Sequence, residues 1–157
     1  MAKLFDGLVT EGLYYDWASL LDWMFDDEKF SNWTPGYVGS LSKKIKKMPK
    51  LSKTNYIYDS AKNLPFDKKH NKRSIKILLA KGDGEAKDFI RHIRNGIAHG
   101  KTSIIKKGDV LYIEIVDYSN SKKQKMQTAY IFMPISYISE IHKLYNDVKK
   151  SFENRRK

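Results

Sequence analysis

The chain has 157 residues, of which 30 are Lys or Arg and 18 are Asp or Glu, so its formal net charge is +12. This excess favours a polyanionic partner, with nucleic acid ahead of a membrane surface, although mere solubility also accounts for a basic chain. The lack of cysteine excludes disulfides and thiolate metal sites, and no apolar run approaches the roughly 20 residues that span a bilayer. We therefore expect a single cytoplasmic domain over residues 1–157, with no membrane segment.

The beginning of the chain is predicted to be helical. Apolar residues at helical spacing indicate a first helix over residues 10–26, and turn-forming residues predict a loop over 30–37. A short helix is expected over residues 38–48, and its polar side carries Lys43, Lys44, Lys46 and Lys47. We expect these four lysines to contact RNA phosphates, although a solvated lysine face fits the pattern about equally well.

The stretch from residue 54 to residue 81 has a weaker pattern. Residues 56–61 suggest one or two helical turns before Pro65. Residues 74–80 could form a helix or a short buried strand, and we favour the helix. Gly82 and Gly84 follow, but they lack the spacing of a phosphate-binding loop.

Residues 83–100, with the sequence DGEAKDFIRHIRNGIAHG, are predicted to form one amphipathic helix. Asp83 is the expected N-cap, and Gly100 suits the left-handed position that often closes a helix. One face is apolar and should pack into the core; it consists of Ala86, Phe89, Ile90, Ile93 and Ile97. The opposite side carries Arg91, Asn95 and His99 at intervals of four, and Arg94 lies at the border.

These polar residues suggest a site that cleaves phosphodiesters. Asn95 and His99 are one turn apart and can touch, whereas Arg94 lies about 140° from His99 around an ideal helix. A histidine can transfer protons near neutral pH, and an arginine can stabilise charge that develops on phosphate oxygens. RNA supplies its own 2′-hydroxyl nucleophile, so the site would need no metal or other cofactor. The alternative is structural, because a histidine in a last turn is often only a favourable cation at the negative end of the helix dipole.

The run from Arg94 to His99, RNGIAH, resembles the R-N-x-x-x-H motif of HEPN domains (higher eukaryote and prokaryote nucleotide-binding). The wider run over residues 89–100 resembles prokaryotic HEPN nuclease-like proteins. This resemblance implies a small helical bundle that dimerises, with one composite cleft between two motif helices. It implies a metal-independent endoribonuclease in which Arg94 and His99 are the catalytic pair and Asn95 is the polar residue after the arginine. HEPN proteins act in toxin–antitoxin, phage-defence and RNA-processing systems, so an antitoxin or regulatory protein could be a further partner.

After Gly100 the pattern changes from helix to strand. Runs rich in β-branched and aromatic residues over 102–133, with a turn at 107–109, predict a small antiparallel hairpin or meander inserted after the motif helix. Pro134 is well placed to open a last helix, and residues 154–157 form a basic tail. His92 and His99 lack a third ligand, so we expect no metal site.

Together these patterns predict a mainly α fold, a HEPN-like helical bundle with a small antiparallel β insertion after the motif helix. The predicted function is RNA cleavage by 2′-hydroxyl attack, with Arg94, Asn95 and His99 as catalytic residues and with Arg91 and the four lysines as RNA contacts. We expect a homodimer in which Gly96 and Ala98 let the two motif helices approach closely. The alternative is a non-catalytic RNA-binding or protein-interaction module, in which the motif residues hold a helix end or a dimer seam.

Overall fold

The computed structural model describes residues 35–46, 56–66, 75–82, 84–119 and 125–155. The helices in these ranges are α4 (Pro35–Lys46), α5 (Glu85–Ala98) and α6 (Ser136–Arg155). The strands are β1 (Tyr56–Asp59), β2 (Lys76–Ala80), β3 (Thr102–Lys107), β4 (Val110–Tyr118) and β5 (Gln127–Pro134). The helix expected over residues 10–26, the Asp83 cap and Lys47 lie outside the described residues. No helix in these described ranges is long and apolar enough to cross a membrane.

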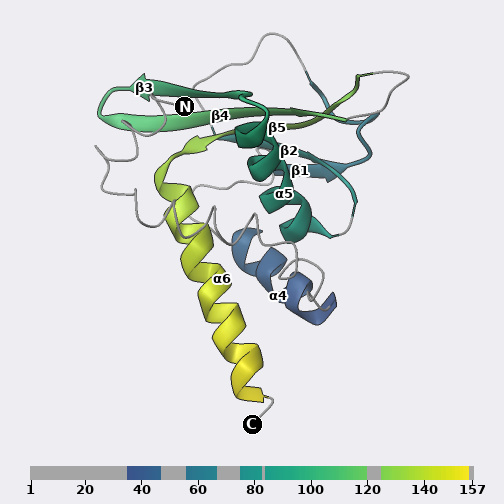
Figure 1. The fold of residues 1–157 in the computed structure, drawn as a ribbon, viewed down its shortest axis with the longest axis vertical. Helices are drawn as coiled ribbons and strands as arrows, with labels where there is room; N and C mark the ends of the chain where they lie inside the picture. The colour runs from purple at the N-terminus through teal and green to yellow at the C-terminus, as the bar shows by residue number, and fades with distance from the viewer. Residues whose placement is uncertain (1–34, 47–55, 67–74, 83, 120–124, 156–157) are drawn as a thin grey trace.

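The fold is organised around a five-stranded sheet with the strand order β1-β2-β5-β4-β3 (Figure 1). The β1–β2 pair is parallel and the other three pairs are antiparallel, so the sheet is mixed. This arrangement contradicts the mainly α bundle expected from the sequence. The strands expected over 102–133 do form an antiparallel meander. They make up three of the five strands of the central sheet, however, and are not a small insertion.

The sequence interpretation was wrong at β1 and β2, for which we favoured helix. Ile77, Leu78 and Leu79 of β2 are all 0% exposed, because this strand lies between β1 and β5 and is covered on both faces. A strand covered on both faces loses the alternation of apolar and polar residues that reveals most strands. Its short apolar run is therefore indistinguishable from one turn of a buried helix.

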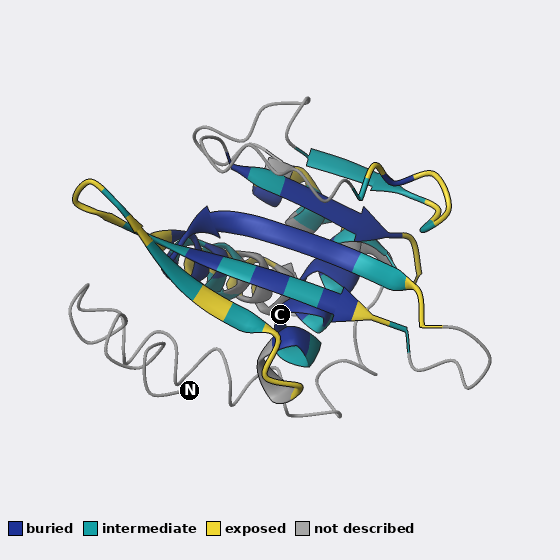
Figure 2. Ribbon diagram, turned by 90° about the horizontal axis from the view of Figure 1, so that it is seen from above, coloured by how far each residue is buried: buried dark blue, intermediate teal, exposed yellow. Residues whose placement is uncertain are grey.

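The three described helices lie on one side of the sheet, and Figure 2 shows the buried residues along its central strands. Phe89, Ile90 and Ile93 of α5 are at most 1% exposed and belong to the main core cluster, with residues of β2, β4 and β5. This result confirms the expected apolar face of the motif helix, apart from Ile97, whose side chain is not described. The other face of the sheet carries a second apolar cluster, which includes Leu78, Tyr130 and Phe132.

Both ends of α5 are fixed by specific contacts. Gly100 has a φ of 65°, which confirms the left-handed closure expected from the sequence, and the Lys101 N–H donates to the Gly96 carbonyl at 2.8 Å, as in a Schellman motif. At the other end, the Ala86 N–H donates to Oγ of Ser42 in α4 at 3.0 Å. This contact satisfies one of the N–H groups that the first turn of a helix leaves without an intrahelical partner. The motif helix is therefore held at a defined position between α4 and the sheet.

Two other predicted helices are confirmed with shifted limits. The helix expected over residues 38–48 is α4, which begins earlier because Pro35 starts its first turn. The last helix, α6, begins at Ser136 and not at Pro134. Pro134 still pairs with Tyr112 at the end of β5, a strand end where a missing N–H is tolerated.

Candidate functional site

The motif helix lies in direct contact with β4 at Gly96. A Cβ added to Gly96 would meet Cγ2 of Ile115 at only 2.2 Å, so any larger residue would push the helix and the strand apart. Ile115 and Asp117 lie on the same face of β4, because side chains alternate along a strand. From the sequence we expect Gly96 to allow the close approach of a second motif helix. In the structure Gly96 instead faces Ile115 and allows β4 to approach α5, and this approach brings Asp117 within reach of α5.

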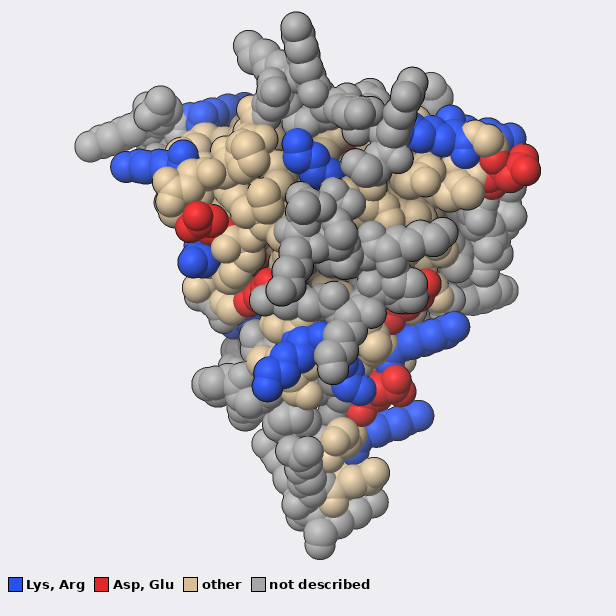
Figure 3. Space-filling model, turned by 180° about the vertical axis from the view of Figure 1, so that it is seen from behind, with Lys and Arg blue, Asp and Glu red and all other residues tan. Residues whose placement is uncertain are grey.

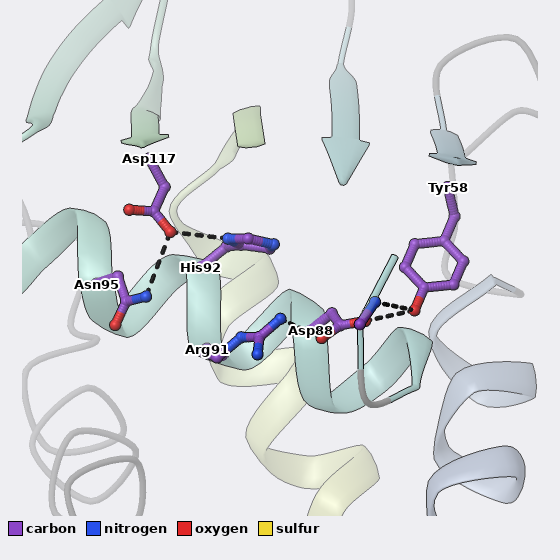
Figure 4. A network of polar contacts seen from close by, with 7 residues as sticks. Tyr58, Asp88, Arg91, His92, Asn95 and Asp117 are labelled. Atoms are coloured by element: carbon purple, nitrogen blue, oxygen red, sulfur yellow. Dashed lines mark hydrogen bonds and ion pairs between the residues drawn. The ribbon is translucent and has the colours of Figure 1, made fainter. Parts of the chain in front are cut away.

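Asp117 joins two residues of α5 in a buried network (Figure 4). Its Oδ2 lies 2.8 Å from Nδ1 of His92 and accepts a hydrogen bond from Nδ2 of Asn95 at 3.3 Å. Its Oδ1 accepts a hydrogen bond from the Tyr118 N–H at 2.9 Å. Asp117 is 2% exposed and His92 is 4% exposed, so these hydrogen bonds replace the water that a carboxylate loses on burial.

Neither Asp117 nor His92 belongs to the site residues predicted from the sequence. The one local signal for Asp117 is its position in β4, where it continues the inward-facing series of Leu111, Ile113 and Ile115. A polar residue at an inward position is informative, because it needs a partner there. The sequence does not show that this partner is the motif helix.

The three predicted catalytic residues lie in the second half of α5 and just after it. Arg94 and Asn95 are half-buried, and His99 is exposed. The His99 N–H still donates to the Asn95 carbonyl at 2.9 Å, so the backbone stays helical to this point. The side chain of Asn95 turns to Asp117 and not to His99. Arg94 is five positions before His99, about 140° away around the helix, so one copy of α5 directs the two side chains to different sides.

Arg91 was expected to add positive charge for RNA, and the structure pairs it with Asp88 (Figure 4). The Asp88 carboxylate is fully buried and also accepts hydrogen bonds from the Tyr58 hydroxyl and, at 2.8 Å, from the Gly82 N–H. Burial, together with the hydrogen bond to Asp88, raises the pKa of Tyr58 to about 12. The Arg91 side chain remains 37% exposed, which leaves it accessible to a phosphate.

Two of the lysines predicted to bind RNA lie on α4, near the first turn of α5 and therefore far from the end that carries His99. Lys43 and Lys44 are exposed on α4, directly after the Ser42 that contacts the first turn of α5. Ala86 and His99 are 13 positions apart, which corresponds to roughly 20 Å along an α-helix. Figure 3 shows further Lys and Arg side chains over the helical part of the molecule and at both ends of the sheet. The side chain of Lys46 is not described, so only two of the four lysines can be placed.

The polar groups at this site are suited to hydrogen bonding and proton transfer. Within the described ranges, no three or more His, Asp and Glu side chains gather in a way that could hold a metal ion. Asn95 and Arg91 offer polar groups at the surface of α5, and His99 offers an exposed imidazole at its end. Such a set can bind a phosphate and move a proton.

Comparison with known proteins confirms the resemblance seen in the motif. The family model described as HEPN pEK499 p136 matches residues 25–156, which include the three described helices and all five strands. No curated protein and no solved structure matched the chain. Since the match covers well over half of the sequence, the chain belongs to this HEPN family.

Proposed function

We propose that this HEPN protein is a metal-independent endoribonuclease whose catalytic residues are Arg94, Asn95 and His99. The observation that carries the proposal is the R-N-x-x-x-H series at the end of a helix that is anchored along most of its length. The apolar face of α5 is buried in the core, and its Schellman closure leaves His99 exposed at the surface. An anchored helix with an exposed final histidine provides the rigid support that a catalytic group needs.

In this proposal the 2′-hydroxyl oxygen of RNA attacks the adjacent phosphorus, and the bond from phosphorus to the 5′-oxygen breaks. The proton of the 2′-hydroxyl is removed as the P–O bond forms, and the leaving 5′-oxygen gains a proton. His99 takes part in this transfer, and Arg94 stabilises the negative charge on the phosphate oxygens. The products are a 2′,3′-cyclic phosphate and a 5′-hydroxyl.

The proposal includes a homodimer, because Arg94 and His99 point to different sides of one helix. If two motif helices pack across a two-fold axis, Arg94 of one copy can reach a phosphate bound at His99 of the other. Lys43 and Lys44, next to the Ser42 that contacts the first turn of α5, would then bind RNA phosphates near the opposite end of that helix from His99. A toxin or phage-defence effector, controlled by an antitoxin or regulatory protein, is the role that the HEPN resemblance favours.

The test is cleavage of a mixed RNA pool by the wild type and by His99→Ala, both in excess EDTA, followed by analysis of the product ends. We expect the wild type to leave cyclic phosphates and His99→Ala to be inactive while it retains its affinity for RNA. His142→Ala, which alters a half-buried histidine of α6 outside the motif, is the matched control and should cleave normally.

Two outcomes would contradict the proposal. Products with other ends would exclude attack by the 2′-hydroxyl. A wild type that binds RNA without cleaving it, together with a His99→Ala variant of altered stability or dimerisation, would favour the non-catalytic interaction module.

A further inference from the structure

We infer that Asp117 of β4 is a positioning residue, which orients the motif residue Asn95 for RNA cleavage. This inference rests on the proposed ribonuclease function and adds to it a residue outside the motif helix. It is carried by the hydrogen bond between Asn95 and Asp117, by the way in which Asp117 is itself held, and by the approach of β4 to α5 at Gly96.

The first step concerns the direction of the Asn95 amide. A carboxylate only accepts hydrogen bonds, so the Nδ2 group of Asn95 must face Asp117. The amide oxygen is then turned away from Asp117, as Figure 4 shows. Asn95 therefore offers a hydrogen-bond acceptor on its outer side, where Arg91 and His99 are its neighbours four positions away on α5. An acceptor there can hold an imidazole N–H of His99 or the 2′-hydroxyl of RNA.

The second step concerns what keeps Asp117 in place. Its two carboxylate oxygens accept hydrogen bonds from donors that do not belong to the motif: the His92 ring contacts Oδ2 at 2.8 Å, and the Tyr118 N–H contacts Oδ1 at 2.9 Å. Asp117 itself pairs with Ala129 of β5, while the pairing of β4 with β3 ends at Ile115. Asp117 is thus a fixed support for the Asn95 amide.

The third step concerns His99, which the same strand also helps to place. The Lys101 carbonyl, two residues after His99, accepts a hydrogen bond from the Val116 N–H at 3.0 Å. The end of β4 therefore contacts the chain both at Asn95 and just beyond His99. Because a displacement of about 1 Å can lower a catalytic rate on the order of 100-fold, this shared support can determine activity without touching the RNA.

The fourth step is the energetic disadvantage of an acid at this position. An apolar residue would continue the inward face of Leu111, Ile113 and Ile115 without a desolvation penalty. A buried carboxylate is tolerated only because several donors surround it. An apolar residue at this position could bind neither the His92 ring nor the Asn95 amide, so the acid supplies the polar contacts between β4 and α5.

The experiment is a double-mutant cycle that compares Asp117→Asn, Asn95→Ala and the double variant. Single-turnover cleavage of a labelled oligoribonucleotide gives the rate, and titration with the same RNA gives the affinity. We expect Asp117→Asn to lower the rate by about 10- to 100-fold with an affinity within about twofold of the wild type. In the Asn95→Ala background, the same substitution should have almost no further effect on the rate, because the residue through which Asp117 acts is gone.

Glu114→Gln is the matched control, since it makes the same acid-to-amide change on the same strand. Glu114 lies on the opposite face of β4 and accepts a hydrogen bond from the Tyr130 hydroxyl at 2.7 Å. We expect this variant to cleave RNA at the wild-type rate. Thermal unfolding provides a separate structural measurement. Any loss of stability from Asp117→Asn should persist in both backgrounds, because the contacts with His92 and Tyr118 change in both.

One measurement uses only the wild-type protein, so it tests the inference even if the variants fail to fold. Hydrogen exchange of side-chain amides in the wild type should be slower at Asn95 than at the exposed Asn154. Equal exchange at the two residues would overturn the inference, as would equal losses of rate from Asp117→Asn in both backgrounds. If the wild type does not cleave RNA, the proposed function fails and this inference fails with it, whereas additive rate losses refute the inference alone.

Discussion

Gly96 and Gly39 provide a test of the close contact between α5 and β4, because the same substitution should stabilise the protein at Gly39 and should not stabilise it at Gly96. Both glycines lie within helices. A Cβ on Gly39 would meet nothing within 4 Å, whereas a Cβ on Gly96 would lie 2.2 Å from Cγ2 of Ile115. We therefore propose to measure the free energy of unfolding of Gly39→Ala and Gly96→Ala by denaturant titration.

The expected magnitudes follow from two opposing terms. Replacing glycine by alanine in a helix interior stabilises it by about 1 kcal/mol, and Gly39→Ala should show this gain alone. At Gly96 the new methyl group would lie more than 1 Å inside an ordinary carbon–carbon contact of about 3.5–4.0 Å. Ile115 is 0% exposed, so its methyl group cannot move out into solvent and must displace other core atoms to give way. Such overpacking costs roughly 1–3 kcal/mol, so Gly96→Ala should be neutral or destabilising by up to about 2 kcal/mol.

The difference between the two variants, about 1–3 kcal/mol, isolates the overpacking, because the helix-propensity term is common to both. Adding Ile115→Ala should relieve the clash, so the double variant Gly96→Ala/Ile115→Ala should be more stable than the sum of the single effects predicts. If Gly96→Ala is as stabilising as Gly39→Ala, the close approach of α5 to β4 is incorrect. The geometry argued for Asp117 and Asn95 would then be incorrect as well.

Three further predictions concern the dimer, the lysines and Tyr58. Mixing Arg94→Ala and His99→Ala proteins should restore roughly a quarter of the wild-type cleavage rate if each site of a two-fold dimer combines Arg94 of one copy with His99 of the other; no recovery after subunit exchange would exclude that composite site. Replacing Lys43 and Lys44 by Ala should weaken RNA binding and reduce the salt dependence of the affinity by about 0.7 in slope for each lost phosphate contact; an unchanged slope would remove this surface from the binding site. The pKa of Tyr58 is raised to about 12, so the folded state retains this proton more strongly than the unfolded chain. The stabilisation that the Tyr58 hydroxyl contributes is therefore fully present below pH 10 and is lost as the pH rises to about 12. Tyr58→Phe should make the free energy of unfolding less dependent on pH in that window. An unaltered pH profile would contradict the assigned environment of Tyr58.

The motif helix could be predicted from the sequence because its determinants are local. Its apolar face repeats with the period of a helix, and Phe89, Ile90 and Ile93 are all buried as that period requires. Its end is encoded by Gly100, whose positive φ a glycine adopts without strain. The R-N-x-x-x-H series is equally local, and the family match confirms the HEPN resemblance that rests on it.

The helix cap at Ser42 and the strands β1 and β2 could not be predicted in the same way. The Ser42 hydroxyl accepts a hydrogen bond from the Ala86 N–H, which is 44 residues away in the chain. The strand β2 pairs with β5, which lies some 50 residues further along the chain. The sequence pattern of a segment shows which of its own residues avoid water, but it does not show which other segment covers them. Where both faces are covered, as at Leu78, even the period is lost.

By itself, the sequence therefore determined the helix that carries the motif, the family and three candidate catalytic residues. Only the tertiary structure decided that this helix packs on a mixed sheet and that Asp117 lies beneath Asn95. The physical reason is the range of the interactions involved. Helix periodicity and a glycine closure act over a few residues, whereas Asp117 contacts Asn95 and His92 across 22 and 25 positions of the chain. That contact exists only because Gly96 lets the strand and the helix meet.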